Sequence, residues 1–158
     1  MKNIAIAAAF VAAAAATTAH AQTATQSVGF EVQAISQIAF TGSPSLVISS
    51  ATAGSAPTSA TGSATYAVTT NETNQKITAE IDSDMPSGVT LSVNLAAPSG
   101  ASSAGAVSLG TAAQDVVTGI STLNASGLSV GYTLSATSAA GVVPADSRTV
   151  TYTITAGS

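Results

Sequence analysis

One stretch decides the fold of this chain: Leu128-Ser129-Val130-Gly131-Tyr132-Thr133-Leu134-Ser135-Ala136. Its larger apolar residues alternate with small or hydroxyl residues, and successive side chains of a strand point to opposite faces of a sheet. The period of two therefore predicts a strand with one buried face and one face in water. The same alternation recurs at the following residues: 28–32, 64–70, 76–82, 89–95 and 149–155. No segment shows the period of an amphipathic helix, so we expect an all-β chain.

Turn-forming residues separate these runs. They cluster at residues 71–74, 85–88, 98–100, 124–127 and 143–146, and all five prolines fall in connections, where they remove no ladder hydrogen bond. The pattern predicts an antiparallel, Ig-like β-sandwich of about 8–10 short strands, with a small barrel as the alternative.

The first 21 residues have the layout of a secretory signal peptide. Lys2 supplies the positive end, residues 4–16 form an apolar run, and Ala19-His20-Ala21 matches the A-x-A cleavage pattern. The run is shorter than the roughly 20 residues that cross a bilayer as a helix. We expect cleavage before Gln22, secretion to the periplasm, the cell surface or the extracellular space, and no integral membrane segment.

Composition excludes several kinds of function. Charged residues make up 6% of the chain, the formal net charge is −4, and there is no Cys. Beyond residue 21 the only cations are Lys76 and Arg148, and no His remains. Two cations cannot neutralise a nucleic-acid backbone, and catalysis by a Ser-His-Asp or Cys-His arrangement needs an imidazole. We expect a protein that is not an enzyme, with no catalytic residue, no organic cofactor and no nucleic-acid partner.

The acidic residues Glu80, Asp82 and Asp84 form the one candidate metal site. Residues at i, i+2 and i+4 share one face of a strand, and carboxylate oxygens suit Ca²⁺. The alternative is a solvated strand face whose charges discourage edge pairing.

Residues 25–40 alternate over an unusual length, but the apolar parity breaks around residues 34–36. One explanation is a first strand that crosses from one sheet to the other. The other is an N-terminal extension, residues 22–34, that adds to the sheet of a neighbouring subunit, while residues 35–158 form the sandwich domain. In that case Val28, Phe30 and Val32 would be the subunit contacts.

The predicted strands contain no Pro and almost no Lys, which are the residues that commonly protect a sheet edge from pairing. Either the fold covers these edges, or association between copies is the function. A head-to-tail contact of this kind does not close and therefore makes a filament.

The order of these features resembles that of secreted pilin-like and spore-coat-U-like β-sandwich subunits. The resemblance lies in the signal peptide, the alternating N-terminal strand, the Thr-rich strands and the final Arg148-Thr149-Val150-Thr151-Tyr152-Thr153-Ile154-Thr155. It implies an Ig-like fold, export and polymerisation by donor-strand exchange. Residues 77–91 are also similar to a stretch in small secreted bacterial proteins of unassigned function.

The leading hypothesis is an exported, non-enzymatic structural subunit of an extracellular fibre, pilus or surface coat. Its partner would be a second copy of itself, with other envelope or surface proteins as further candidates. The competing hypothesis is a monomeric extracellular binding or adhesion module, stabilised by Ca²⁺ through Glu80, Asp82 and Asp84.

Overall fold

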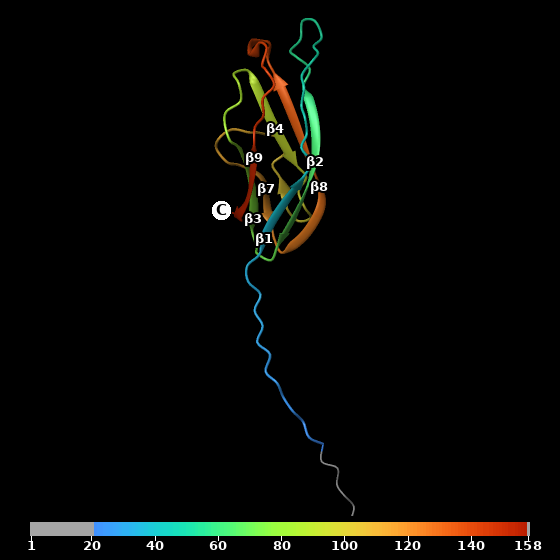
Figure 1. Cartoon of the computed structure of the whole chain (residues 1–158), viewed down its shortest axis with the longest axis vertical. Coiled ribbons are helices and arrows are strands. Elements are labelled where there is room, and N and C mark those ends of the chain that lie inside the picture. Colours follow the sequence, from blue (N-terminus) through green and yellow to red (C-terminus); the bar gives the residue numbers. More distant parts are fainter. Residues whose placement is uncertain (1–20, 158) are drawn as a thin grey trace, which may run out of the picture. The chain divides into compact units, whose positions relative to one another are not determined.

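A computed structural model describes residues 21–157 of the chain, and Figure 1 shows its strands. The expected signal peptide, residues 1–21, lies outside the described residues except for Ala21. Residues 21–32 and residues 33–157 belong to separate units. The second unit contains a 3-10 turn, η1 (Ser138–Ala140), and these strands: β1 (Ser36–Thr41), β2 (Ala60–Thr70), β3 (Gln75–Ile81), β4 (Val89–Leu95), β5 (Ser102–Ser103), β6 (Val107–Ser108), β7 (Gln114–Ile120), β8 (Leu123–Ala136) and β9 (Val150–Ala156).

The strands form two antiparallel sheets. The five-stranded sheet has the order β1-β2-β8-β4-β6, and the four-stranded sheet has the order β5-β7-β3-β9. Every strand pair is antiparallel, and side chains from both sheets share one apolar core. The prediction of an all-β antiparallel sandwich is confirmed, and the number of strands lies within the expected range.

The core follows directly from the alternation in the sequence. In β3, every second residue from Gln75 to Ile81 is buried, while the residues between them are partly exposed. The same pattern in β2 and β4 places one face of each strand inside and leaves Thr and Ser toward water. The largest fully buried side chains are Tyr66, Ile77, Leu95, Ile120, Val68, Val93, Val116, Val117 and Val130.

The predicted turn at residues 124–127 is wrong, because these residues lie inside the long strand β8. Tyr66 pairs with Leu128 while Val68 pairs with Ala125, so two residues of β8 stand opposite the single residue between Tyr66 and Val68. This is a β-bulge, and Gly127 adopts a φ of 67° within it. The Asn-Ala-Ser-Gly sequence suits a bulge as well as a turn, because both need a residue with positive φ.

Candidate functional site

Residues 21–35 carry no helix or strand. The expectation that residues 25–40 form one strand crossing between the sheets is therefore wrong, since β1 begins only at Ser36 and belongs to one sheet. Within the segment, the exposed fractions are 75% for Val28, 95% for Phe30 and 79% for Val32. Three large apolar side chains at i, i+2 and i+4 are thus left in water, on what would be one face of an extended chain.

Asn71, just after β2, fixes the point at which the chain leaves the sandwich. Its side-chain oxygen accepts a hydrogen bond from the backbone N–H of Ile35 at 2.7 Å, and its side-chain nitrogen donates to the carbonyl of Gln33 at 2.7 Å. Its backbone N–H also donates to the carbonyl of Ile35 at 3.1 Å. The amide thus continues the β1–β2 pairing by one further step.

A network of hydroxyl and carboxylate groups supports this junction. The Ser36 hydroxyl lies 2.8 Å from that of Thr70 and donates to a carboxylate oxygen of Glu72 at 2.7 Å. These bonds hold the first residue of β1 against the end of β2. The backbone at Gln33 and Ile35 is therefore held by hydrogen bonds to Asn71. The sequence predicts only a turn at Asn71, and its position directly after a strand is the one signal in the sequence for this role.

The sandwich has two long free edges. β1 pairs only with β2, and β9 pairs only with β3. The other outer strands, β5 and β6, have two residues each, and very short edge strands offer little template for pairing. Neither β1 nor β9 contains Pro or a charged residue. Both therefore present unprotected backbone N–H and C=O groups.

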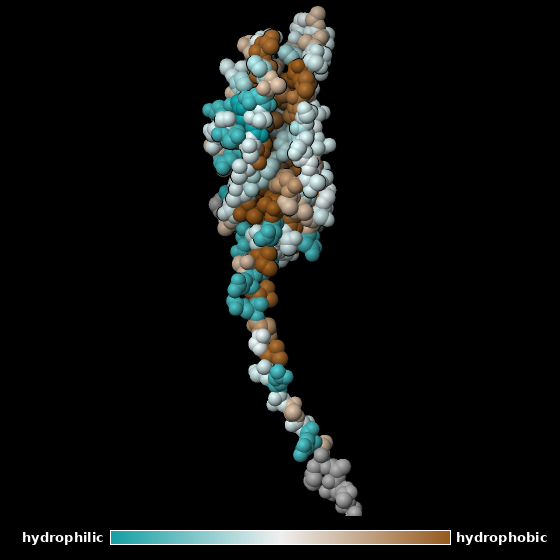
Figure 2. Space-filling model, in the orientation of Figure 1, coloured by the Kyte–Doolittle hydropathy of each residue, from teal (hydrophilic) through white to brown (hydrophobic). Residues whose placement is uncertain are grey.

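The inward side chains of these two edge strands are only half-buried. Every second residue of β1 and of β9 is partly exposed and none is fully buried, whereas the neighbouring strands β2 and β3 carry fully buried positions. Figure 2 shows hydrophobic residues on the same face on which Figure 1 places β1 and β9. We call the partly buried apolar residues of this side the edge seam: Ile38, Phe40, Val150, Tyr152 and Ile154.

Aromatic side chains bridge the two sheets across the edge seam. The rings of Phe40 in β1 and Tyr152 in β9 are stacked, with centroids 3.9 Å apart and planes at 16°. Tyr66 stacks on the Phe40 ring at 5.5 Å. The Tyr152 hydroxyl lies 2.8 Å from that of Tyr132 in β8, and the Tyr66 hydroxyl donates to the carbonyl of Ala96 at 2.6 Å.

Burial raises the pKa of two of these phenols. It raises the pKa of Tyr66 to about 12. Burial raises the pKa of Tyr152 well above its usual value, and the hydrogen bond to Tyr132 raises it further. Tyr66 and Tyr152 therefore stay neutral to a higher pH than a tyrosine in water.

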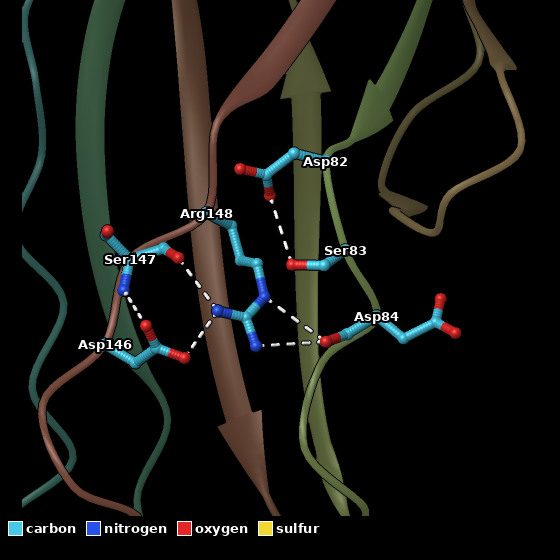
Figure 3. A network of polar contacts seen from close by, with 6 residues as sticks. All are labelled: Asp82, Ser83, Asp84, Asp146, Ser147 and Arg148. Atoms are coloured by element: carbon cyan, nitrogen blue, oxygen red, sulfur yellow. Dashed lines mark hydrogen bonds and ion pairs between the residues drawn. The ribbon is translucent and has the colours of Figure 1, made fainter.

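The structure does not bring the three predicted calcium ligands together. Glu80 lies in β3, and Figure 3 shows that the carboxyl groups of Asp82 and Asp84 point to opposite sides of the chain. Asp82 accepts a hydrogen bond from Ser83 at 3.4 Å, and Asp84 accepts one from Thr111 at 3.4 Å. Within residues 21–157, no three His, Cys, Asp or Glu side chains are grouped so that they could hold a metal ion.

Arg148 joins this region to the chain that precedes β9, as Figure 3 shows. Its Nε and Nη2 donate to the backbone carbonyl of Asp84 at 3.2 and 3.0 Å. Its Nη1 donates to the Asp146 carboxylate at 2.5 Å and to the Ser147 carbonyl at 2.8 Å. The Arg148 hydrogen bond, with a second from the backbone N–H of Ser147, lowers the pKa of Asp146. The guanidinium therefore holds the loop at residues 146–148 against the backbone of Asp84.

Lys76 is also paired, since its Nζ lies 3.0 Å from the Asp115 carboxylate of the adjacent strand β7. Both cations that follow residue 21 are thus in ion pairs with neighbouring carboxylates.

A surface hollow of about 410 Å³ lies at the end of the sandwich that contains Asn71. No acidic or basic side chain lines the hollow, so its surface consists of hydroxyl, amide and aliphatic groups. The lining residues are Ile35, Thr69, Thr70, Asn71, Thr122, Leu123 and Asn124.

The chain matches no protein-family model, no curated protein and no solved structure. Among residues 21–157, no helix is long and apolar enough to span a membrane.

Proposed function

We propose that this protein is an exported structural subunit of an extracellular fibre or surface coat. Residues 22–34 of one copy add as a strand to the edge seam of the next. The observation that carries the proposal is the exposure of Val28, Phe30 and Val32, at 75%, 95% and 79%, in a chain whose sandwich has two uncharged free edges. Strand addition gives backbone hydrogen bonds to the edge and buries alternate side chains.

The spacing of the apolar side chains supports this pairing. Val28, Phe30 and Val32 stand at i, i+2 and i+4, and so do Val150, Tyr152 and Ile154 of β9. At about 3.3 Å per residue, each triplet spans about 13 Å along a strand. The extension of residues 22–34 would reach about 40 Å, which is longer than either β1 or β9.

The position of the charged residue in the extension also supports strand addition at the edge seam. Residues 22–34 contain one charged side chain, Glu31, on the face opposite Phe30. A strand that turns Phe30 toward the seam leaves Glu31 in water, so no charge is buried on assembly. Because the donated segment and the seam are different surfaces, the contact is head-to-tail and continues into a filament.

Export is part of the same proposal. The sequence of residues 1–21 supports it, and the chain beyond residue 21 has neither His nor Cys to carry nucleophilic catalysis. The proposed role is therefore that of a structural subunit.

Sedimentation of the exported protein over a concentration series tests the proposal. We expect polymers for the native chain and monomers after deletion of residues 22–34 or after Phe30→Asp. Ser27→Asp adds the same charge on the opposite face of the segment, and we expect it to polymerise. The proposal fails if the native chain stays monomeric in concentrated solution, or if both Asp variants behave alike.

A further inference from the structure

The Phe40–Tyr152 stack lies where the proposed donated strand would have to pack. The two rings come from the two free edges, which belong to different sheets and share no ladder of backbone hydrogen bonds. Ring centroids 3.9 Å apart are in direct contact, so no side chain fits between them. The stack therefore closes the edge seam in the single subunit through side chains alone.

Each of the two rings also contacts a second tyrosine. Tyr66 packs on Phe40 at 5.5 Å from the adjacent strand β2, and the Tyr132 hydroxyl lies 2.8 Å from that of Tyr152. Contact between the Phe40 and Tyr152 rings removes apolar ring surface from water. Closing the seam is therefore favourable for the isolated subunit.

The stack also sits at the centre of the seam. Tyr152 is the middle residue of the triplet in β9, and Phe30 is the middle residue of the triplet in the extension. Alignment of the two triplets brings Phe30 of the incoming copy to the stack. Because the two rings are in direct contact, a Phe30 ring that is buried between the two edges at this point must displace Phe40 from Tyr152.

We propose that the Phe40–Tyr152 stack is an autoinhibitory latch, which closes the edge seam of the free subunit and opens when Phe30 of a second copy takes its place. This inference rests on the proposed function. A closed seam keeps the Phe40 and Tyr152 rings in contact with each other in the free subunit, and the central ring of the extension supplies the contact that replaces the lost one.

Binding kinetics test the latch in the full exported chain. The acceptor carries Phe30→Asp, which stops it from acting as a donor, and the probe is a fluorescent synthetic peptide of residues 22–34. Opening must precede burial of the probe, so we expect the observed rate to level off as peptide concentration rises. A rate that stays linear in peptide concentration overturns the latch.

Substitutions in the stack give a second, independent readout. Phe40→Leu and Tyr152→Leu each keep an apolar side chain but remove the stacked ring. Since the smaller Leu side chain buries less apolar surface than the ring that it replaces, we expect the plateau rate to rise about threefold to tenfold. Tyr66→Phe is the control, because it loses the bond to Ala96 and leaves the Phe40–Tyr152 rings in place; its plateau rate should not change.

The outcomes separate the latch from the proposed function. Unchanged or slower uptake by both Leu variants overturns the latch but leaves strand addition standing, because the peptide still binds. If the peptide binds neither the acceptor nor any variant, strand addition at this seam is refuted, and the latch with it. If a Leu variant does not fold, as its thermal unfolding would reveal, the concentration dependence in the Phe30→Asp chain still decides.

Discussion

Replacing Phe30 by Ala should weaken assembly while leaving the folded subunit as stable as before. The Phe30 side chain is 95% exposed, so almost all of its burial would come from contact with another copy. Burying a Phe side chain is worth about 1.5–3 kcal/mol, and the Ala that replaces it recovers only a small part. We therefore expect a loss of about 2 kcal/mol in assembly, which corresponds to roughly a 30-fold rise in the concentration of half-assembly.

Two measurements on the same protein check this prediction. Sedimentation over a concentration series gives the concentration of half-assembly, and thermal unfolding followed by circular dichroism gives the stability of the subunit. Surface substitutions away from special features change stability by less than about 0.5 kcal/mol, so the melting temperature should hold. Ser27→Ala, on the opposite face, should change neither quantity. The reasoning is refuted if half-assembly is unchanged, or if Phe30→Ala lowers the melting temperature by several degrees.

Three further predictions concern the sandwich itself. Burial raises the pKa of Tyr66 to about 12, so its contribution to stability is fully present below pH 10 and should decline between pH 10 and pH 12; alkaline unfolding that is identical in Tyr66→Phe would contradict this. Gly127 has a φ of 67° in the β8 bulge, so Gly127→Ala should lower the free energy of unfolding in urea by about 1 kcal/mol. Gly29→Ala, with no atom within 4 Å of an added Cβ, is the control and should leave that free energy unchanged. Equal effects of the two substitutions would show that backbone conformation is not the cause. Adding Ca²⁺ should leave the melting temperature unchanged, because Asp82 and Asp84 point apart; a rise that Asp82→Asn abolishes would instead support the competing binding module.

The strands themselves could be predicted from the sequence, because a strand with one buried and one solvent-exposed face has alternating apolar and polar residues. The alternation at residues 128–136 lies within β8, and the run at residues 89–95 coincides with β4. The error at residues 124–127 also has a local cause, since a bulge and a turn require the same residue types. Only the pairing of β2 with β8 distinguishes the two.

The arrangement of the candidate site could not be predicted, because it depends on contacts between distant parts of the chain. Unprotected edges were expected in general, but the sequence does not say that β1 and β9 are the strands left free. Nothing local to Phe40 or Tyr152 indicates that the two rings stack. The alternation at residues 28–32 predicts a strand, but residues 21–35 carry none in the single chain, and the role of these side chains in assembly stays a prediction.

The central claim is that residues 22–34 join one subunit to the next, and electron microscopy of the concentrated exported protein tests it most directly. We predict filaments for the native chain and isolated particles for the Phe30→Asp variant at the same concentration. Isolated particles for the native chain, or filaments of unchanged form in the variant, would contradict the account.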